Sequence, residues 1–168
     1  MTIFNTLKWQ RYGILCLLCC AVLVVSGCSK RRSEQYRAEG DTLRGLNRLD
    51  SAREAYEKAA TANPDNPMAP LGLALCSEAE GKTDEALALF REALALDTSL
   101  EAAYVEAIRM LVSAARMEEA LALSDDYAKQ TPEAGGTLRG VVLMKMGRAE
   151  EAIQVLSTLA GVYPDSES

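Results

Sequence analysis

One spaced set of residues returns along this chain at a fixed interval. Its first copy is Ala52, Tyr56, Ala59 and Pro64, and 34 positions later stand Ala86, Phe90, Ala93 and Thr98. A unit of this length cannot bury its apolar face alone, so the units of such a repeat stack on one another. The interval therefore predicts an elongated stack of similar units rather than one rounded core.

The pattern continues to the end of the sequence in weaker copies. The third copy has Ala120, Ser124, Tyr127 and Pro132, and the fourth has Ala152, Leu156, Leu159 and Pro164. Each copy is preceded by a matching first half, which contains in turn Gly40, Ala74, Ala107 and Gly140. The departures are Ser124 in an aromatic position, Ile108 in a small one, and Gly136 where a large residue is usual.

Composition and turn signals divide each unit into two helices. Ala, Leu and Glu are abundant and favour helix, and Gly81 and Gly147 stand where a positive φ would separate paired helices. The predicted pairs are 33–46 with 49–62, 67–80 with 83–96, 101–114 with 117–130, and 133–146 with 149–161. The fold class is therefore all-α, a helix-turn-helix solenoid.

This pattern resembles the tetratricopeptide repeat (TPR) on the Ala52, Tyr56, Ala59 and Pro64 set and its copies. The resemblance covers 33–165 as about four repeats: 33–66, 67–100, 101–132 and 133–165. It implies small residues where paired helices touch and an aromatic residue where repeats stack. It also implies a concave groove, lined by the first helix of each pair, that binds protein segments.

The N-terminal segment is typical of a bacterial lipoprotein signal peptide. Lys8 and Arg11 precede an apolar run over 12–25, which is shorter than the roughly 20 residues of a spanning helix. The stretch from Val25 to Cys28 resembles a lipobox. The resemblance implies a cleaved signal at 1–27, a covalent lipid on Cys28, and a lipidated tether at 28–32. An uncleaved anchor and an ordinary cleaved signal are the alternatives.

Cleavage would change the charge and the cysteine content. The chain has 18 Lys and Arg against 24 Asp and Glu; two of the basic residues leave with the signal, so the mature charge is about −8. Such an acidic body is a poor candidate for binding nucleic acid. Cys76 is expected in the core, with a redox role as the alternative. Ser29, in place of an aspartate, favours the outer membrane, facing the periplasm.

The tether constrains where the partner lies. Four residues, 29–32, span at most roughly 14 Å when extended, so the folded part is held at the membrane surface. Lys30, Arg31 and Arg32 either lie against anionic headgroups or form a solvated tether. A membrane-embedded or membrane-proximal protein is therefore the expected partner.

Catalytic chemistry has little support in the sequence. The absence of histidine removes Ser-His-Asp and Cys-His catalysis and His-ligated metal sites. Gly135-Gly136 is not followed by the lysine of a phosphate loop. The adjacent carboxylates Asp125-Asp126 and Glu118-Glu119 point in different directions on a helix. We expect no enzyme, no metal site, and no cofactor besides the lipid on Cys28.

The binding groove is expected on the side of each first helix that is opposite its packed face. In the first unit this row is charged, with Glu34, Arg37, Asp41 and Arg44. Further along it is mainly apolar, with Met68, Leu71, Leu75, Val105, Arg109, Val112, Val141 and Met144. Exposed apolar surface of this kind usually marks an interaction site. If the helical register is off by one position, these residues belong to the core instead.

The last helix pair predicts a second apolar surface, because a repeat stack needs polar ends and no solvating helix follows this pair. The residues concerned are Ile153, Val155, Leu156, Leu159, Val162 and Tyr163 on the last helix, and Val141, Val142, Leu143, Met144 and Met146 on the preceding one.

Together these features predict a membrane-anchored TPR scaffold. It resembles pilotin-like and secretion-associated TPR lipoproteins, which implies assembly or stabilisation of an envelope complex in secretion, a pilus or export. Two alternatives remain open. The chain could form a homodimer through its C-terminal helix, or it could be an adaptor that tethers a periplasmic enzyme.

Overall fold

A computed structural model describes residues 27–162, and every regular element in that range is a helix. An N-terminal helix covers 27–45. It is followed by α2 (Leu49–Ala62), α3 (Met68–Ala79), α4 (Thr83–Leu96), α5 (Glu101–Ser113), α6 (Met117–Gln130), α7 (Pro132–Lys145) and α8 (Ala149–Val162). The predicted all-α fold is confirmed, and most helix ends fall within one or two residues of the predicted ones.

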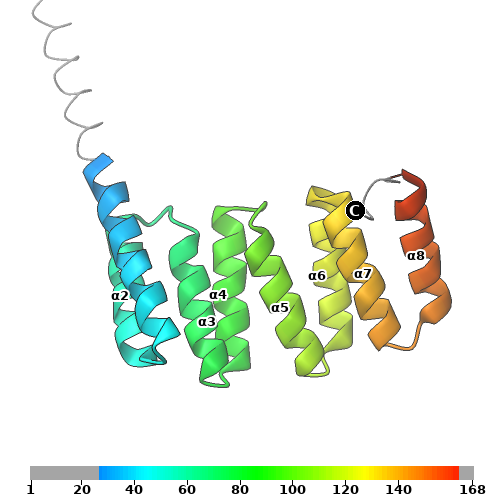
Figure 1. Ribbon diagram of the computed structural model, residues 1–168, viewed down its shortest axis with the longest axis horizontal. Coiled ribbons are helices and arrows are strands. Elements are labelled where there is room, and N and C mark those ends of the chain that lie inside the picture. The colour runs from blue at the N-terminus through cyan, green and yellow to red at the C-terminus, as the bar shows by residue number, and fades with distance from the viewer. Residues whose placement is uncertain (1–26, 163–168) are drawn as a thin grey trace, which may run out of the picture.

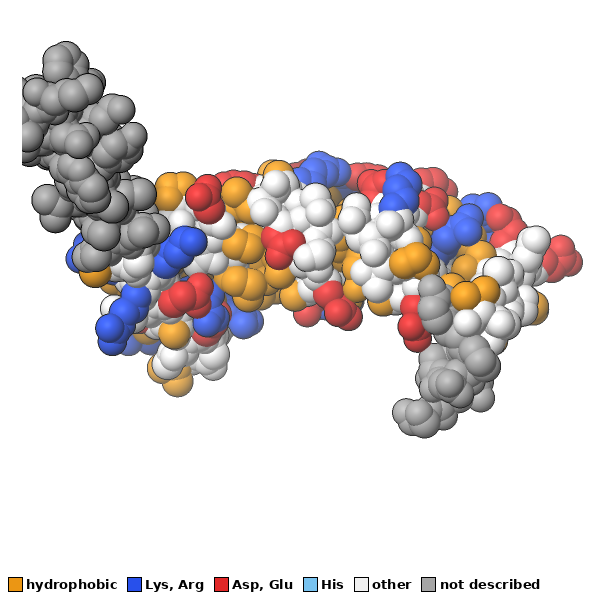
Figure 2. All heavy atoms as spheres, turned by 90° about the horizontal axis from the view of Figure 1, so that it is seen from above, with side chains coloured by type: hydrophobic (Ala, Val, Ile, Leu, Met, Phe, Trp, Pro, Cys, Tyr) orange, Lys and Arg blue, Asp and Glu red, His pale blue; other side chains and the backbone are white. Residues whose placement is uncertain are grey.

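The helices stand side by side in a row, with the N-terminal helix and α8 at opposite ends (Figure 1). Each helix packs mainly on its neighbours in sequence, as in a solenoid, and α5 also touches α7, the first helix of the next unit. Seen from above, charged side chains of both signs are interspersed over the body, with apolar side chains exposed between them (Figure 2).

The same backbone turn separates the two helices of every unit. Asn47, Gly81, Ala115 and Gly147 occupy equivalent positions and all have φ between 57° and 75°. The next residue donates its N–H to a carbonyl five residues earlier, as in Lys82 N to Ser77 O at 2.8 Å and Arg116 N to Leu111 O at 2.9 Å. Such a bond closes a helix C-terminus when one residue is left-handed. The predicted positive φ at Gly81 and Gly147 is confirmed.

The core contains small residues where paired helices touch and aromatic residues where units stack, as the repeat requires. Ala52, Ala86, Ala120 and Ala152 are buried where paired helices meet, and Tyr56 and Phe90 are buried in the aromatic position. In the third unit Ser124 occupies that position, and Tyr127, one turn later, stacks on Tyr104 with ring centroids 4.6 Å apart. The third unit thus keeps an aromatic contact although Ser124 breaks the pattern.

The glycines of the last unit make room for leucines of α8. A Cβ at Gly136 would lie 2.8 Å from Leu159 Cδ1, and a Cβ at Gly140 would lie 2.8 Å from Leu156 Cδ2. Gly135 packs directly against the backbone of Ala128 on α6. The missing large side chain at Gly136 is therefore compensated by Leu159, which fills the space from the opposite helix.

The N-terminal helix begins earlier than predicted. Residues 28–32 are helical, so they advance the chain by about 1.5 Å per residue rather than as an extended tether. Buried Ser33 then donates to Ala59 O (2.8 Å) and accepts from Asn66 Nδ2 (2.9 Å). These bonds join the helix to α2 and to the loop before α3. Within 27–162 no helix is long and apolar enough to cross a bilayer. The predicted signal at 1–27 lies almost entirely outside the described residues.

Candidate protein-binding surface

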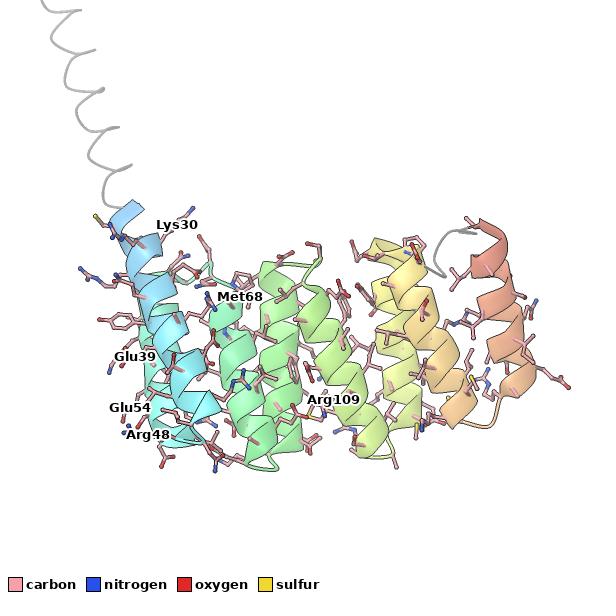
Figure 3. All side chains as sticks on the ribbon, viewed as in Figure 1. Lys30, Glu39, Arg48, Glu54, Met68 and Arg109 are labelled. Carbon is pink, nitrogen blue, oxygen red and sulfur yellow. The ribbon has the colours of Figure 1, made fainter. Side chains whose placement is uncertain are left out.

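The first helices of the four units carry the predicted groove row, and its members differ in exposure. Leu71 is only 4% exposed and belongs to the main core, so its prediction as a groove residue is corrected. Arg109 is exposed, and Val141 and Met144 are 47% and 62% exposed. The remaining apolar members are half-buried: Met68, Leu75, Val105 and Val112. Figure 3 shows Met68 at the start of α3 and Arg109 on α5.

Exposure along the row depends on the helix that follows. Leu71, Val105 and Thr137 are equivalent positions of successive units, and they are buried, half-buried and exposed in that order. For Leu71 on α3 the next unit supplies a further first helix, α5, and for Val105 on α5 it supplies α7. No first helix follows α7 in the described chain. The same reason accounts for the exposure of Val141 and Met144. Sequence periodicity gives the face of a helix but not the cover that a neighbouring unit supplies.

A cleft of about 320 Å³ opens between the starts of α5 and α7. It is lined by Val105 of the predicted groove row and by Ala134 and Thr137, which stand in the same row on α7. Five residues outside that row complete the lining: Glu101, Tyr127, Thr131, Glu133 and Leu138. The lining is mostly apolar at the floor, where Tyr127 is buried. Burial raises the pKa of Tyr127, and the negative charge of nearby Glu101 raises it further. Glu101 and Glu133 stand at equivalent positions of the repeat, and this sequence signal was available to identify them as a pair.

The charged residues of the row compensate one another. Arg37 pairs with Glu34 (2.8 Å) and Asp41 (2.6 Å) on its own helix. Arg109 pairs with Glu106 on its own helix (2.6 Å) and with Glu78 on α3 (2.7 Å). The hydrogen bond with Glu106 is the main cause that raises the pKa of Arg109. The Glu78–Arg109 pair therefore links successive first helices and leaves no isolated cation there to clamp a carboxylate.

The adjacent carboxylates do not form a shared acid–base site. Asp125 pairs with Arg139 on α7, whereas Asp126 pairs with Lys129 on its own helix, both at 2.7 Å. Glu119 binds Arg116 at 2.6 Å. Over residues 27–162, no three Cys, Asp or Glu side chains gather as metal ligands.

The two cysteines in the described range differ sharply. Cys76 is buried, as predicted for a packing residue, and this burial raises the pKa of its thiol. Cys28, the predicted lipidation site, is exposed. A buried thiol with a raised pKa is poorly reactive, which argues against a redox role for Cys76.

The surface predicted for the last helix pair is smaller than expected. Ile153 and Val162 on α8 are 66% and 64% exposed, but Val142 and Leu143 on α7 are buried. The prediction for these two residues was wrong because α7 packs closely on both α6 and α8, which leaves them in the interior. Val155, Leu156 and Leu159 are half-buried, and Tyr163 lies outside the described residues.

Comparison with known proteins supports the repeat assignment. Two family models, both described as tetratricopeptide repeat, match residues 37–101 and 137–166, which together make up more than half of the chain. No curated protein matches the sequence.

Solved structures share the fold at low identity. PilF of Pseudomonas aeruginosa is 18% identical, with 82% of this chain and 64% of PilF aligned and a TM-score of 0.66. PilW, a type IV pilus biogenesis factor, is 24% identical, with 81% and 64% aligned and a TM-score of 0.65. The first TPR of Spaghetti (RPAP3), bound to an HSP90 peptide, is 20% identical, with 76% and 98% aligned and a TM-score of 0.57. The repeat matches and the common fold place this chain in the tetratricopeptide repeat family.

Proposed function

We propose that this chain is a scaffold that binds another protein along the row of its first helices, while a lipid on Cys28 holds it at the membrane of the cell envelope. The observation that carries the proposal is the row itself. It combines exposed Val141 and Met144 on α7 with the apolar cleft between α5 and α7. Exposed apolar surface next to a preformed cleft is typical of an interaction site.

The relatives agree with a binding role. The RPAP3 structure holds a peptide of HSP90 on the same fold, and PilW is named as a pilus biogenesis factor. From these proteins we infer that the ligand of this chain is a protein. We also infer that the two act in an envelope complex such as a pilus, secretion or export machine. Arg109 is not a free cation for an acidic ligand, because it already pairs with Glu78 and Glu106.

The anchor is proposed from the sequence and fits the geometry around it. Cys28 is exposed within the N-terminal helix. The buried Ser33–Asn66 hydrogen bond fixes that helix on the body. A lipid on Cys28 would thus hold the row of first helices at a fixed orientation to the outer membrane, facing the periplasm. Replacing Cys28 with Ser should move the full chain from the membrane fraction to the soluble fraction.

A photo-crosslinking amino acid placed at Val141 tests the binding surface. In cells that produce the full chain, we expect an adduct with a distinct partner from Val141 and none from Ile153 on α8, although Ile153 is the more exposed of the two. An adduct that forms only from Ile153 would overturn the assignment of the surface.

Self-association is the second candidate, favoured by the exposure of Ile153 and Val162 on one helix. It predicts a dimer mass by light scattering in detergent, reduced to a monomer by Ile153→Glu. A monomer at all protein concentrations would exclude it.

A further inference from the structure

The cleft between α5 and α7 has an apolar floor and a negatively charged rim. Its floor is apolar, with Val105, Ala134 and Leu138, whereas Glu101 and Glu133 stand exposed at its rim. No Lys or Arg belongs to its lining. A ligand in this cleft therefore meets two negative charges and no positive one.

These two carboxylates differ from those nearby because they lack a counter-charge. Glu78 and Glu106 both bind Arg109, and Asp126 binds Lys129. Neither Glu101 nor Glu133 has an ion pair within the part of the chain that the structure describes. The equivalent residues of the first two units are Ser33 and Pro67. Among the starts of the first helices in the described chain, glutamate thus stands at this position only on α5 and α7, which border the cleft.

We propose that the cleft binds an extended protein segment that carries one apolar side chain flanked by Lys or Arg residues. This inference rests on the proposed function and adds the chemistry of the ligand. A volume of about 320 Å³ is at the low end of the roughly 300–1,000 Å³ of ligand pockets. It accommodates one or two side chains rather than a whole helix. Opposite charges on the flanks supply complementarity and hence specificity.

Exposed glutamates without an ion pair also occur at other helix starts in the described chain. Glu101 and Glu133 both lie in the first turn of a helix, where the helix dipole favours acidic residues. Glu118 and Glu150 also lie in first turns, on α6 and α8, are exposed and lack an ion pair among the described residues. They line none of the cleft. The Glu118→Gln/Glu150→Gln variant is therefore a matched control for net charge and helix start.

The test begins with a library of short random peptides displayed on phage and panned against the full chain in a non-ionic detergent. We expect enrichment of peptides in which Leu, Ile, Val, Met or Phe stands between Lys or Arg residues. Enrichment of acidic peptides, or of basic ones without an apolar residue, would overturn the inference. If no peptide is enriched at all, both this inference and the proposed function fail.

The most enriched peptide is then labelled, and its dissociation constant is measured by fluorescence anisotropy. Glu101→Gln/Glu133→Gln should weaken binding by about fivefold or more, since two exposed charge pairs are lost, and added salt should weaken the wild type similarly. The control variant should stay within about twofold. If Val141→Glu/Met144→Glu abolishes binding while Glu101→Gln/Glu133→Gln binds like the wild type, the proposed function stands and this inference is wrong.

Discussion

At the scale of single residues, the fit of Tyr56 shows how two units are held together. Its ring lies against Gly40 of the N-terminal helix and Gly72 of α3, and both glycines leave the space that the ring fills. Its hydroxyl donates to Asp41 Oδ1 at 2.7 Å. One side chain on α2 therefore joins its own unit to the next, through packing on both sides and a hydrogen bond at the tip.

Replacing Gly72 with Ala should destabilise the fold. The added methyl group would overlap the Tyr56 ring, and overpacking of this kind costs about 1–3 kcal/mol. Gly45 is the matched control, because it lies on the N-terminal helix with no atom near its absent Cβ. Urea unfolding should show a loss for Gly72→Ala and none for Gly45→Ala. Equal stability of the two variants would contradict the packing described for Tyr56.

Tyr56 should also make stability depend on alkaline pH. Burial, helped by the hydrogen bond to Asp41, raises the pKa of Tyr56 from 10.0 to about 12. Between these values the folded chain keeps a proton that the unfolded chain loses, so the free energy of unfolding falls as pH rises, by about 2–3 kcal/mol in all. The Tyr56→Phe variant should lose less stability over this range. Parallel pH profiles for the two proteins would refute this role of the phenol.

At the scale of helices, the turns between paired helices repeat one backbone conformation with different residues. Ala115 adopts φ of 58° where Gly81 and Gly147 adopt 75°. A residue with a Cβ pays about 1–2 kcal/mol for this conformation, whereas glycine does not. The α5–α6 turn is therefore strained relative to the α3–α4 and α7–α8 turns.

The Ala115→Gly variant should be more stable than the wild type, by about 0.5–1 kcal/mol after the entropy cost of glycine. The neighbouring Ala114 has φ of −83°, so Ala114→Gly should instead lower stability. Thermal unfolding of the two single variants compares them directly. A loss of stability in both would mean that Ala115 is not strained.

The junction between the first two units also contains a polar cluster. Arg53 on α2 binds Glu80 (3.0 Å), Glu85 (2.9 Å) and buried Ser77 (3.1 Å). In the next unit the equivalent residue is Leu87, which is buried in the main core. At this position the first unit thus offers a cation to the second unit, whereas the second unit offers an apolar side chain to the third.

This polar junction should weaken in acid. The hydrogen bond from Lys82 lowers the pKa of Glu80, that from Ser77 lowers the pKa of Glu85, and Arg53 contributes to both. Stability from such carboxylates is present above their ordinary pKa near 4.5 and is lost as pH falls below it. The Arg53→Met variant should lose less stability between about pH 6 and pH 3, measured by urea unfolding. An unchanged acid dependence would contradict the assignment.

Helix ends were predictable because the repeat fixes the phase of every unit, as the turns at Gly81 and Gly147 illustrate. Burial was less predictable. Leu75 and Val141 have equivalent places in their units, yet Leu75 is half-buried against the main core and Val141 is 47% exposed. The rim of the cleft was missed for a related reason. Glu101 and Glu133 line the same cleft only because α5 and α7 pack together. The residue pattern of a single helix does not encode this packing.

At the scale of the whole molecule, the candidate surfaces are separated along the stack. The N-terminal helix with exposed Cys28 lies at one end, α8 with exposed Ile153 lies at the other, and α3, α5 and α7 run between them (Figure 1). A lipid at one end would therefore leave the row of first helices free for a partner. The separation also makes the two candidate interfaces testable by different single changes.

The most direct test of the central claim is capture of partners by the tagged full chain from its own detergent-solubilised membranes, followed by mass spectrometry. The variants to compare are Val141→Glu/Met144→Glu and Ile153→Glu, after circular dichroism shows equal helicity. We predict that the first variant loses a specific partner by about tenfold or more, while Ile153→Glu keeps it. Retention of every partner by the first variant, or loss of the partner only in Ile153→Glu, would contradict binding along the first helices.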